Sequence, residues 1–216
     1  MLSGAIFDMD GLLLDTERLY EKAWRNAAKA FGQEHSEEFH RNVCGTNGEK
    51  MLQVIAKYYP QVDNAEFMHY CLNNFQEMIQ EGVPEKAGMR QILHYFQENG
   101  VKMAVASSSA PEVIASNLGR LDVLKYFTAV VSGHQVAKGK PAPDIFLLAA
   151  QKLELAPKDC YVFEDSGNGI RAGAAAGCRT IMIPDLIPPT EELCQLSDGV
   201  YGSLGDFVAA SARGEI

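Results

Sequence analysis

The sequence contains few cysteines and arranges none of them in closely spaced pairs. Its five cysteines are scattered, with no Cys-x-x-Cys motif, and its five histidines show no His-x-x-x-His spacing. Disulfide frameworks and zinc sites both need such regularly spaced ligands, so we predict neither of them. We expect buried free thiols instead, and these suit a reducing, cytoplasmic location.

The sequence also lacks a long apolar run. No stretch approaches the roughly 18 apolar residues that a membrane-spanning helix needs. Met1 leads directly into a strand-like run, without the charged and apolar regions of a signal peptide. We therefore expect neither a signal peptide nor any association with a membrane.

Basic residues are in the minority, with 19 Lys and Arg against 28 Asp and Glu and a formal net charge of -9. They are scattered, whereas nonspecific nucleic-acid binding depends on clustered basic residues that displace counterions. Nucleic acid is therefore not an expected partner. The remaining composition, 47% hydrophobic and 22% charged in 216 residues, is that of a globular protein with one large domain or a core carrying an insertion.

Short apolar runs of strand length alternate with helical segments over most of the chain. The runs are SGAIF (3–7), VKMAVA (101–106), TAVVS (128–132), CYVF (160–163) and RTIMI (179–183). The helical segments are Met89–Asn99, Pro111–Leu118, Asp144–Leu153 and Gly169–Ala176. This alternation predicts an α/β fold, a Rossmann-like parallel sheet flanked by helices. From Asp185 onward we expect only a peripheral turn and helix.

The stretch between the first two runs has a different pattern. From about Thr16 to Pro84 the apolar residues recur at helical spacing and no strand-like run is present. It is predicted to be a helical unit inserted after the first strand, with a return linker around Gly82 to Gly88. We assign residues 1–14 and 87–216 to the core and residues 15–86 to the insertion.

Polar residues follow the predicted strands at the edge where parallel sheets bind ligands. They are Asp8 and Asp10 after the first strand, Ser107, Ser108 and Ser109 after the second, Lys140 beyond the third, and Glu164 and Asp165 after the fourth. Carboxylates suit a hard metal ion, while a lysine and hydroxyl groups suit the oxygens of a phosphate. The set therefore predicts magnesium-assisted phosphoryl transfer.

Each of these residues also has an ordinary structural interpretation. An aspartate after a strand commonly forms a turn, and a lone lysine is commonly a surface residue. The serine cluster is able to cap the helix that Pro111 begins, and Glu164 with Asp165 is able to stabilise the dipole of the helix that follows. Only their occurrence together favours a reactive site.

Two other ligand-binding motifs are disfavoured. A calcium-binding loop needs oxygen ligands at alternating positions, but leucines occupy positions 12 to 14. The segment GNGIRAG (167–173) superficially resembles a dinucleotide-binding motif. It has the wrong spacing to its third glycine, and two acidic residues precede it. We expect its small residues to let a helix pack closely against the sheet.

Four segments in order resemble the motifs of the haloacid dehalogenase superfamily, in its β-phosphoglucomutase-like branch with a helical cap. They are FDMDGLLLDTE, VASSSA, GKPAPDIF and FEDSGNGI, and the resemblance covers essentially the whole chain. The leading segment FDMDGLLLDTERLY is also similar to that of the pseudouridine-5'-phosphatase type within this branch.

The resemblance implies a role for each motif residue. Asp8 would be the nucleophile that becomes an aspartyl phosphate, and Asp10 would be the general acid and base. Ser107 and Lys140 would bind the transferring phosphoryl group, with backbone N–H groups of Met9, Asp10 and Ser108.

The resemblance also implies Mg²⁺ as the cofactor. Its ligands would be Asp8, the backbone carbonyl of Asp10, and Asp165. Glu164 would be either a further ligand or a residue that orients the ligands.

We expect a phosphatase that acts on a small phosphorylated metabolite, a sugar or nucleoside phosphate, in a monomer or weak homo-oligomer. Dehalogenation is disfavoured because expelling a halide needs no acid such as Asp10. A hexose-phosphate mutase is an alternative, although Gly48 and Tyr20 stand where mutases of this branch carry an arginine and a histidine. A noncatalytic binding protein is a further alternative. Candidate substrate contacts in the cap are Tyr20, Gly45, Thr46, Asn47, Gly48 and Lys50.

Overall fold

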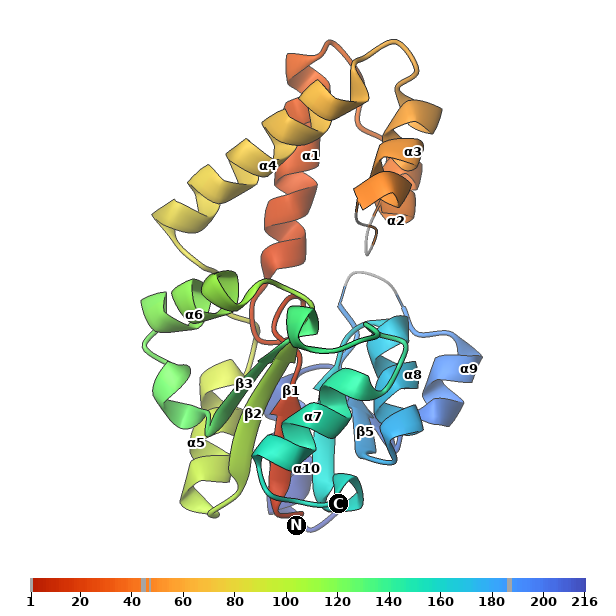
Figure 1. Ribbon diagram of the computed structural model, residues 1–216. Helices are drawn as coiled ribbons and strands as arrows, with labels where there is room; N and C mark the ends of the chain where they lie inside the picture. Colours follow the sequence, from red (N-terminus) through yellow and green to blue (C-terminus); the bar gives the residue numbers. More distant parts are fainter. Residues whose placement is uncertain (1, 44–45, 47, 186–187) are drawn as a thin grey trace. The chain divides into compact units, whose positions relative to one another are not determined.

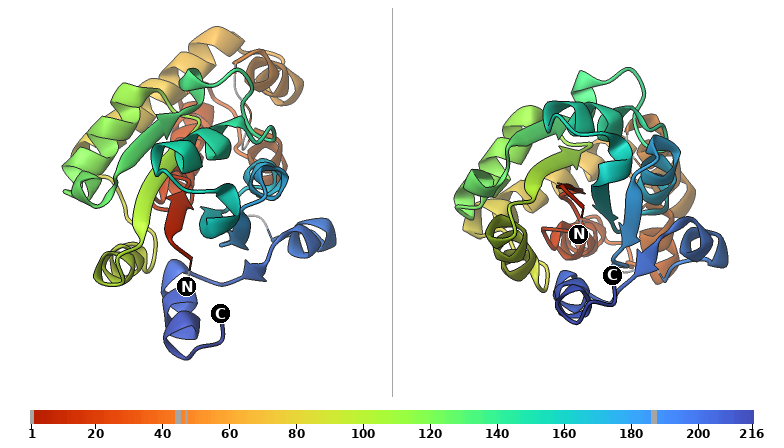
Figure 2. Two further views of the ribbon diagram at one scale, coloured as in Figure 1. Left: turned by 60° about the horizontal axis from the view of Figure 1, so that its bottom comes forward. Right: turned by 90° about the horizontal axis from the view of Figure 1, so that it is seen from below.

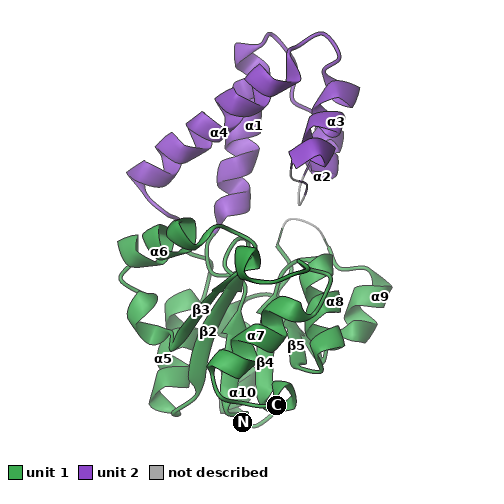
Figure 3. Ribbon diagram, in the orientation of Figure 1, with its two compact units in different colours: residues 1–14, 85–216 green, residues 15–84 purple. Residues whose placement is uncertain are grey.

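A computed structural model describes residues 2–43, 46, 48–185 and 188–216 of the chain. The chain forms two compact units, coloured separately in Figure 3. Met1–Leu14 together with Glu85–Ile216 form the core unit, and Asp15–Pro84 form the helical unit.

The return from the helical unit into the core unit lies slightly earlier than the sequence analysis placed it. Glu85 and Lys86 belong to the core unit because they pair with the end of the first segment. Glu85 forms a β-bridge with Leu14, and the Lys86 N–H donates to the Leu13 carbonyl at 2.9 Å. Two antiparallel pieces of backbone therefore tie the core unit together at this point.

The core unit contains a six-stranded sheet in the order β3-β2-β1-β4-β5-β6, and every neighbouring pair is parallel (Figure 1). The strands are β1 (Gly4–Phe7), β2 (Lys102–Ser107), β3 (Ala129–Ser132), β4 (Cys160–Glu164), β5 (Arg179–Met182) and β6 (Gly199–Val200). Strand order reverses beside β1, which pairs with β2 on one side and β4 on the other. This reversal is the position where open α/β sheets bind ligands.

Helices connect and cover the strands of the core unit. They are α5 (Met89–Glu98), α6 (Pro111–Arg120), α7 (Asp144–Lys152), α8 (Gly167–Ala176), α9 (Glu191–Leu196) and α10 (Leu204–Ala212). Three short 3-10 turns are η1 (Leu124–Tyr126), η2 (Gly133–Gln135) and η3 (Pro157–Asp159). The predicted Rossmann-like fold is confirmed.

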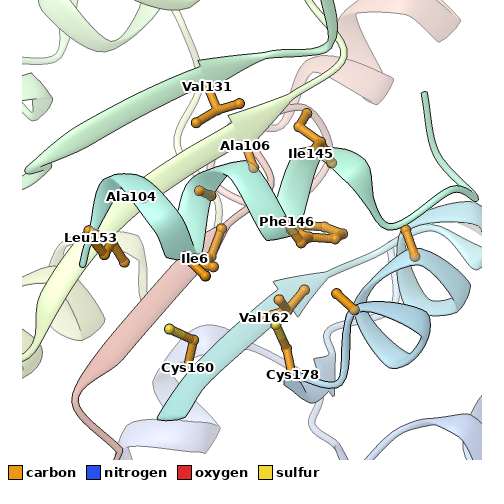
Figure 4. Close-up of a cluster of buried hydrophobic side chains, with 14 residues drawn as sticks. Ile6, Ala104, Ala106, Val131, Ile145, Phe146, Leu153, Cys160, Val162 and Cys178 are labelled. Carbon is orange, nitrogen blue, oxygen red and sulfur yellow. The ribbon is translucent and has the colours of Figure 1, made fainter. Parts of the chain in front are cut away.

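One face of the sheet packs against α7 and α8. Ile6 and Val162 of the central strands belong to one buried cluster with Phe146 of α7, Leu153 directly after α7, and Ala172 of α8. Figure 4 shows the first four of these side chains. Because both faces of the central strands are covered, their sequences are continuously apolar rather than alternating.

The opposite face carries a cluster of phenylalanines. Phe7 stacks on Phe163 with ring centroids 4.9 Å apart, and Phe163 meets Phe207 of α10 edge-on at 4.8 Å. Phe96 of α5 joins the same cluster. Figure 2 shows α7 and α10 on opposite sides of the sheet. The two layers hold the carboxyl ends of β1 and β4 in a fixed position.

The helical unit consists of α1 (Thr16–Ala30), α2 (Glu37–Val43), α3 (Gly48–Tyr58) and α4 (Asn64–Glu81), so the inserted segment is helical as predicted. Buried aromatic side chains form its core, among them Trp24, Phe39 and Phe67. Asp63 caps α4 by accepting hydrogen bonds from two backbone N–H groups.

Two sequence expectations need correction or qualification. The C-terminal stretch contributes strand β6 and helix α10 to the core, beyond the peripheral turn and helix expected there. Cys71, Cys160 and Cys178 are buried free thiols as expected, but Cys194 is exposed, and Cys44 lies outside the described residues. No helix in the described ranges is long and apolar enough to cross a membrane.

Candidate active site

The carboxyl ends of three neighbouring strands bring Asp8, Ser107 and Glu164 to one edge of the sheet. Asp8 directly follows β1, and its N–H donates to the Phe163 carbonyl of β4 at 3.0 Å. Ser107 and Glu164 are the last residues of β2 and β4. All three are buried polar residues, with Ser107 and Glu164 only 1% exposed.

Lys140 connects the first and fourth strands. Its Nζ donates to Asp8 Oδ1 at 2.5 Å, to Glu164 Oε1 at 2.6 Å and to the Ala106 carbonyl at 3.1 Å. These three acceptors use all the donors of a lysine ammonium group. Its side chain is 7% exposed. The predicted Lys140 is therefore a buried bridge between two carboxylates and not a surface lysine.

The second oxygen of Glu164 is occupied as well. Oε2 accepts from the backbone N–H groups of Asp165 and Ser166, at 3.0 and 2.9 Å, and from Ser166 Oγ at 2.9 Å. A Cβ at Gly169 would lie 1.8 Å from the Glu164 carboxyl group, so the first turn of α8 has room for this side chain only because residue 169 is glycine. With both oxygens satisfied by protein donors, Glu164 has the environment of an orienting residue.

Asp10 is held by serines that follow β2. Its Oδ2 accepts from Ser109 Oγ at 2.9 Å and, at the longer distance of 3.4 Å, from Ser107 Oγ. From the sequence, Ser109 was grouped with Ser107 and Ser108 as a hydroxyl suited to phosphate oxygens or to a helix cap. In the structure Ala110 is the residue that precedes α6, and no side chain caps that helix.

Asp165 lies against the turn that carries Asp10. Gly11 has a positive φ of 86°, and a Cβ there would lie 2.4 Å from Asp165 Oδ2. Asp185, expected only to begin a peripheral turn, also lies near this region, and its Oδ1 accepts from Lys86 Nζ at 2.5 Å. Glycine at position 11 therefore lets the first and fourth motifs meet.

Negative charge exceeds positive charge in this buried site. Burial raises the pKa of Asp8 to about 8, with Lys140 opposing the rise and the carboxylates of Glu164 and Asp10 adding to it. The pKa of Asp165 is raised well above its usual range, first by burial and then by Glu164 and Asp8. Burial would lower the pKa of Lys140, but Asp8 and Glu164 outweigh it and raise that pKa.

The donors present fit a hard divalent cation. Asp165 Oδ1 is buried without any hydrogen-bond partner among the described residues, as expected for an oxygen reserved for another ligand. Among the described residues, no group of three His, Cys, Asp or Glu side chains lies close enough together to hold a metal ion by itself. Mg²⁺ is commonly held by only one or two carboxylates, with water and phosphate oxygens, so this arrangement suits it.

The predicted phosphate-binding backbone lies in two adjacent turns. Met9 is buried between Asp8 and Asp10, and its carbonyl accepts from the N–H groups of Leu13 and Leu14. Ser108 follows β2 and is exposed. Both residues therefore lie at the same sheet edge as the carboxylates.

The predicted substrate contacts belong to the helical unit. Tyr20 stacks on Phe75 with ring centroids 3.8 Å apart, and Thr46 Oγ1 donates to the Val43 carbonyl at 2.6 Å. Gly48 begins α3, and Lys50 is exposed on it. Gly45 and Asn47 lie outside the described residues.

The model of the haloacid dehalogenase-like hydrolase family matches residues 5–183. The chain belongs to this family. The matched range contains all the residues of the site described above, apart from Asp185. The resemblance of the four sequence motifs is thereby confirmed.

Other members of the family are similar over most of the chain. A phosphorylated carbohydrates phosphatase of Thermotoga maritima is 35% identical, covering 83% of this chain and 84% of the relative. A "probable pseudouridine-5'-phosphatase" of Drosophila melanogaster is 33% identical, covering 94% and 90%. A β-phosphoglucomutase of Bacillus subtilis is 32% identical, covering 82% and 80%. The expected reaction class, a phosphatase of this family, is confirmed.

Among solved structures, a family hydrolase from Deinococcus radiodurans with bound phosphate and sodium superposes with a TM-score of 0.85. It is 25% identical, and the match covers 98% of this chain and 96% of that one. The family fold therefore extends over both units of this chain.

Proposed function

We propose that this haloacid dehalogenase-like hydrolase is a Mg²⁺-dependent phosphatase that hydrolyses small phosphomonoesters through an aspartyl phosphate on Asp8. The observation that carries the proposal is the buried Lys140 bridge between Asp8 and Glu164, beside Asp10 and the unpartnered Asp165 oxygen of the described site. A nucleophile, a proton-transfer group and a phosphate-neutralising cation thus lie at one sheet edge.

The reaction proceeds in two steps, formation of the aspartyl phosphate and its hydrolysis. In the first, an Asp8 oxygen attacks phosphorus, the ester P–O bond breaks, and the departing oxygen takes a proton from the Asp10 carboxyl group. In the second, water attacks the same phosphorus and gives a proton to Asp10, while the bond between the Asp8 oxygen and phosphorus breaks. This step releases inorganic phosphate and leaves Asp8 as a free carboxylate. Asp10 acts as acid and then as base.

The phosphoryl oxygens are bound by Ser107 and by backbone N–H groups of Met9, Asp10 and Ser108, while the positive charge of Lys140, held beside Asp8, offsets their negative charge. Bound Mg²⁺ would supply positive charge beside the phosphate. We assign Asp8, Asp165 and the Asp10 carbonyl as its protein ligands, and Glu164 as the residue that orients Lys140 and the 165–166 backbone.

We further propose that the helical unit acts as a cap that selects the leaving group. Sugar and nucleoside monophosphates are the expected substrates, because relatives named for phosphorylated carbohydrates and pseudouridine-5'-phosphate span most of this chain. Tyr20, Thr46, Gly48 and Lys50 are the described candidates for substrate contact. A cytoplasmic location and a monomeric or weakly associating chain stay predictions.

Phosphate release tests the proposal. A panel of sugar, nucleoside and polyol phosphates is assayed with Mg²⁺ and with EDTA, using the Asp8→Asn protein as control. Because an amide in place of the Asp8 carboxylate is unable to form the aspartyl phosphate, we expect the activity of this variant to fall by about 10⁴-fold or more. Activity that survives in the Asp8→Asn protein, or in EDTA, contradicts the proposed mechanism.

The Bacillus subtilis relative makes a hexose-phosphate mutase the second candidate. A mutase needs a second cationic side chain in the helical unit to bind the other phosphate, and Lys50, two residues after Gly48, is an exposed basic residue there. The two activities are separated by incubating β-glucose 1-phosphate with catalytic glucose 1,6-bisphosphate. Formation of glucose 6-phosphate faster than release of inorganic phosphate would favour the mutase.

A further inference from the structure

Ser109 makes a contact that the proposed reaction leaves without a role. It lies in the loop between β2 and α6, and its Oγ donates to Asp10 Oδ2 at 2.9 Å. Ser107, which is assigned to phosphate binding, reaches the same oxygen only at 3.4 Å. Ser109 therefore provides the stronger of these two serine contacts to the proton-transfer group.

The backbone of Ser109 is itself fixed from two sides. Ser132 Oγ, at the end of β3, donates to the Ser109 carbonyl at 2.6 Å. The Ser109 N–H donates to Ser107 Oγ at 3.1 Å. Ser132 is 1% exposed, and its own N–H donates to Gln135 Oε1 at 3.1 Å. A serine whose backbone N–H and carbonyl are both held in this way has little freedom to leave Asp10.

The loop is also packed tightly beside Ser109. A Cβ at Gly133 would lie 3.2 Å from the Ser108 Cα, so the start of η2 packs closely against the backbone of the serine segment. The end of β3 therefore supports the end of β2, although β3 contributes none of the residues that react in the proposed mechanism.

We propose that Ser109 is a positioning residue that holds Asp10 in the orientation needed for proton transfer, and that Ser132 holds Ser109. Anchoring one carboxylate oxygen fixes the rotation of the carboxyl group, so that its other oxygen points in a single direction. A general acid or base transfers a proton only from within hydrogen-bond reach of the reacting oxygen. This inference rests on the proposed roles of Asp8 and Asp10.

The proposal predicts that Ser109 matters only for steps that Asp10 serves. Attack of Asp8 on p-nitrophenyl phosphate expels a leaving group that needs no proton, whereas hydrolysis of the aspartyl phosphate needs Asp10 as base. In the Ser109→Ala protein we expect a rapid burst of p-nitrophenolate, at a rate within about 3-fold of the unmodified protein. The steady-state rate after the burst should fall about 10- to 100-fold, part of the 10²- to 10⁴-fold that acid–base catalysis contributes.

Three further variants separate positioning from a general structural effect. Ser109→Thr keeps the hydroxyl group and should recover most of the steady-state rate. Ser132→Ala should give the same burst with a smaller steady-state loss, because it removes only the support of Ser109. Ser116→Ala, on the exposed face of α6, is the matched control and should behave like the unmodified protein.

Two outcomes would overturn the inference. In one, the burst and the steady-state rate of Ser109→Ala fall together, which indicates damage to phosphate binding. In the other, neither changes. If p-nitrophenyl phosphate is not hydrolysed by the unmodified protein, acetyl phosphate replaces it, because its leaving carboxylate also needs no acid. Loss of activity in Asp8→Asn with normal kinetics in Ser109→Ala would refute this inference while leaving the proposed function intact.

Discussion

At the residue scale, the site concentrates carboxylates around a single buried ammonium group. Asp8, Glu164 and Asp165 lie together at the end of β1 and β4, and Lys140 directly neutralises only the first two. Such an arrangement is unfavourable for the protein alone and favourable once a divalent cation binds. The residues that make the chemistry possible should therefore reduce the stability of the metal-free protein.

Replacing Asp165 by asparagine tests this conclusion. Because burial and the neighbouring carboxylates raise its pKa, ionised Asp165 destabilises the folded state as pH rises. In EDTA at pH 8, Asp165→Asn should raise the free energy of unfolding by about 1 kcal/mol, a common size for the effect of one substitution. Urea denaturation measures this value, and a phosphate-release assay should show near-complete loss of activity in the same protein. A less stable variant would mean that Asp165 makes favourable contacts beyond those described.

The sequence predicted most of the site residues at the carboxyl edge of the sheet, but not all of the residues that contact them. The presence of polar residues after the predicted strands was sufficient to select Asp8, Lys140 and Glu164, and Lys140 contacts both carboxylates directly. The contact of Ser109 with Asp10 and the place of Asp185 were not predicted, because one serine among three, or one aspartate in a predicted turn, carries no periodic pattern. Only the folded loops bring them to Asp10 and Asp165.

At the element scale, the site depends on how closely α8 approaches the end of β4. Gly169 leaves room for Glu164, and Gly173 packs near Val162 and Thr180, so the expected close packing of this helix is confirmed. The helix begins two residues earlier than predicted, because Ser166 caps it by accepting from the Gly169 N–H. Strand β6 was missed because two residues are too few to show a pattern.

Substituting Gly169 by alanine should damage stability and activity together. The new Cβ would displace the Glu164 carboxyl group, and with it one partner of Lys140. We expect a loss of roughly 1 to 3 kcal/mol in unfolding free energy, as for other overpacked sites. Phosphate release should fall about 100-fold, because small misplacements of catalytic groups are costly.

Gly119→Ala is the matched control for this experiment. Gly119 also lies within a helix, α6, but nothing lies within 4 Å of the position its Cβ would occupy. It should gain about 0.5 to 1 kcal/mol in stability, because alanine loses less backbone entropy on folding. If both variants behave alike in urea denaturation and in activity, the close approach of α8 is not what positions Glu164.

At the scale of the whole molecule, the fold follows from patterns that extend over many residues. Continuous apolar runs between helices predicted the parallel sheet, and helical spacing predicted the inserted unit, because both patterns reflect which faces are buried. The boundary at Glu85 differs by two residues because backbone pairing with Leu14, which has no sequence pattern, decides it. The proposed metal requirement belongs to this scale as well, since a bound cation would stabilise the folded chain as a whole.

Thermal unfolding with and without Mg²⁺ measures that requirement. The pKa of Asp8 is raised from 3.8 to about 8, so the folded state holds a proton that the unfolded state releases. Without metal, its contribution to stability is therefore lost as pH rises from about 4 through 8. Mg²⁺ competes with protons for the same carboxylates, so its stabilising effect should be larger at pH 8 than at pH 5.5.

The same Mg²⁺ concentration is used at both pH values, about 100 times its Kd at pH 8. At pH 8 it should contribute about 2.7 kcal/mol, or a rise in Tm of roughly 5 to 10 °C for a chain of this size. The Tm values with and without Mg²⁺ are compared at one pH, so the effects of other titrating groups on stability cancel. The Asp165→Asn protein should show little rise at either pH, because it lacks a proposed ligand. Equal rises at pH 5.5 and pH 8 would indicate that the cation binds away from these carboxylates, and no rise would remove magnesium from the proposed function.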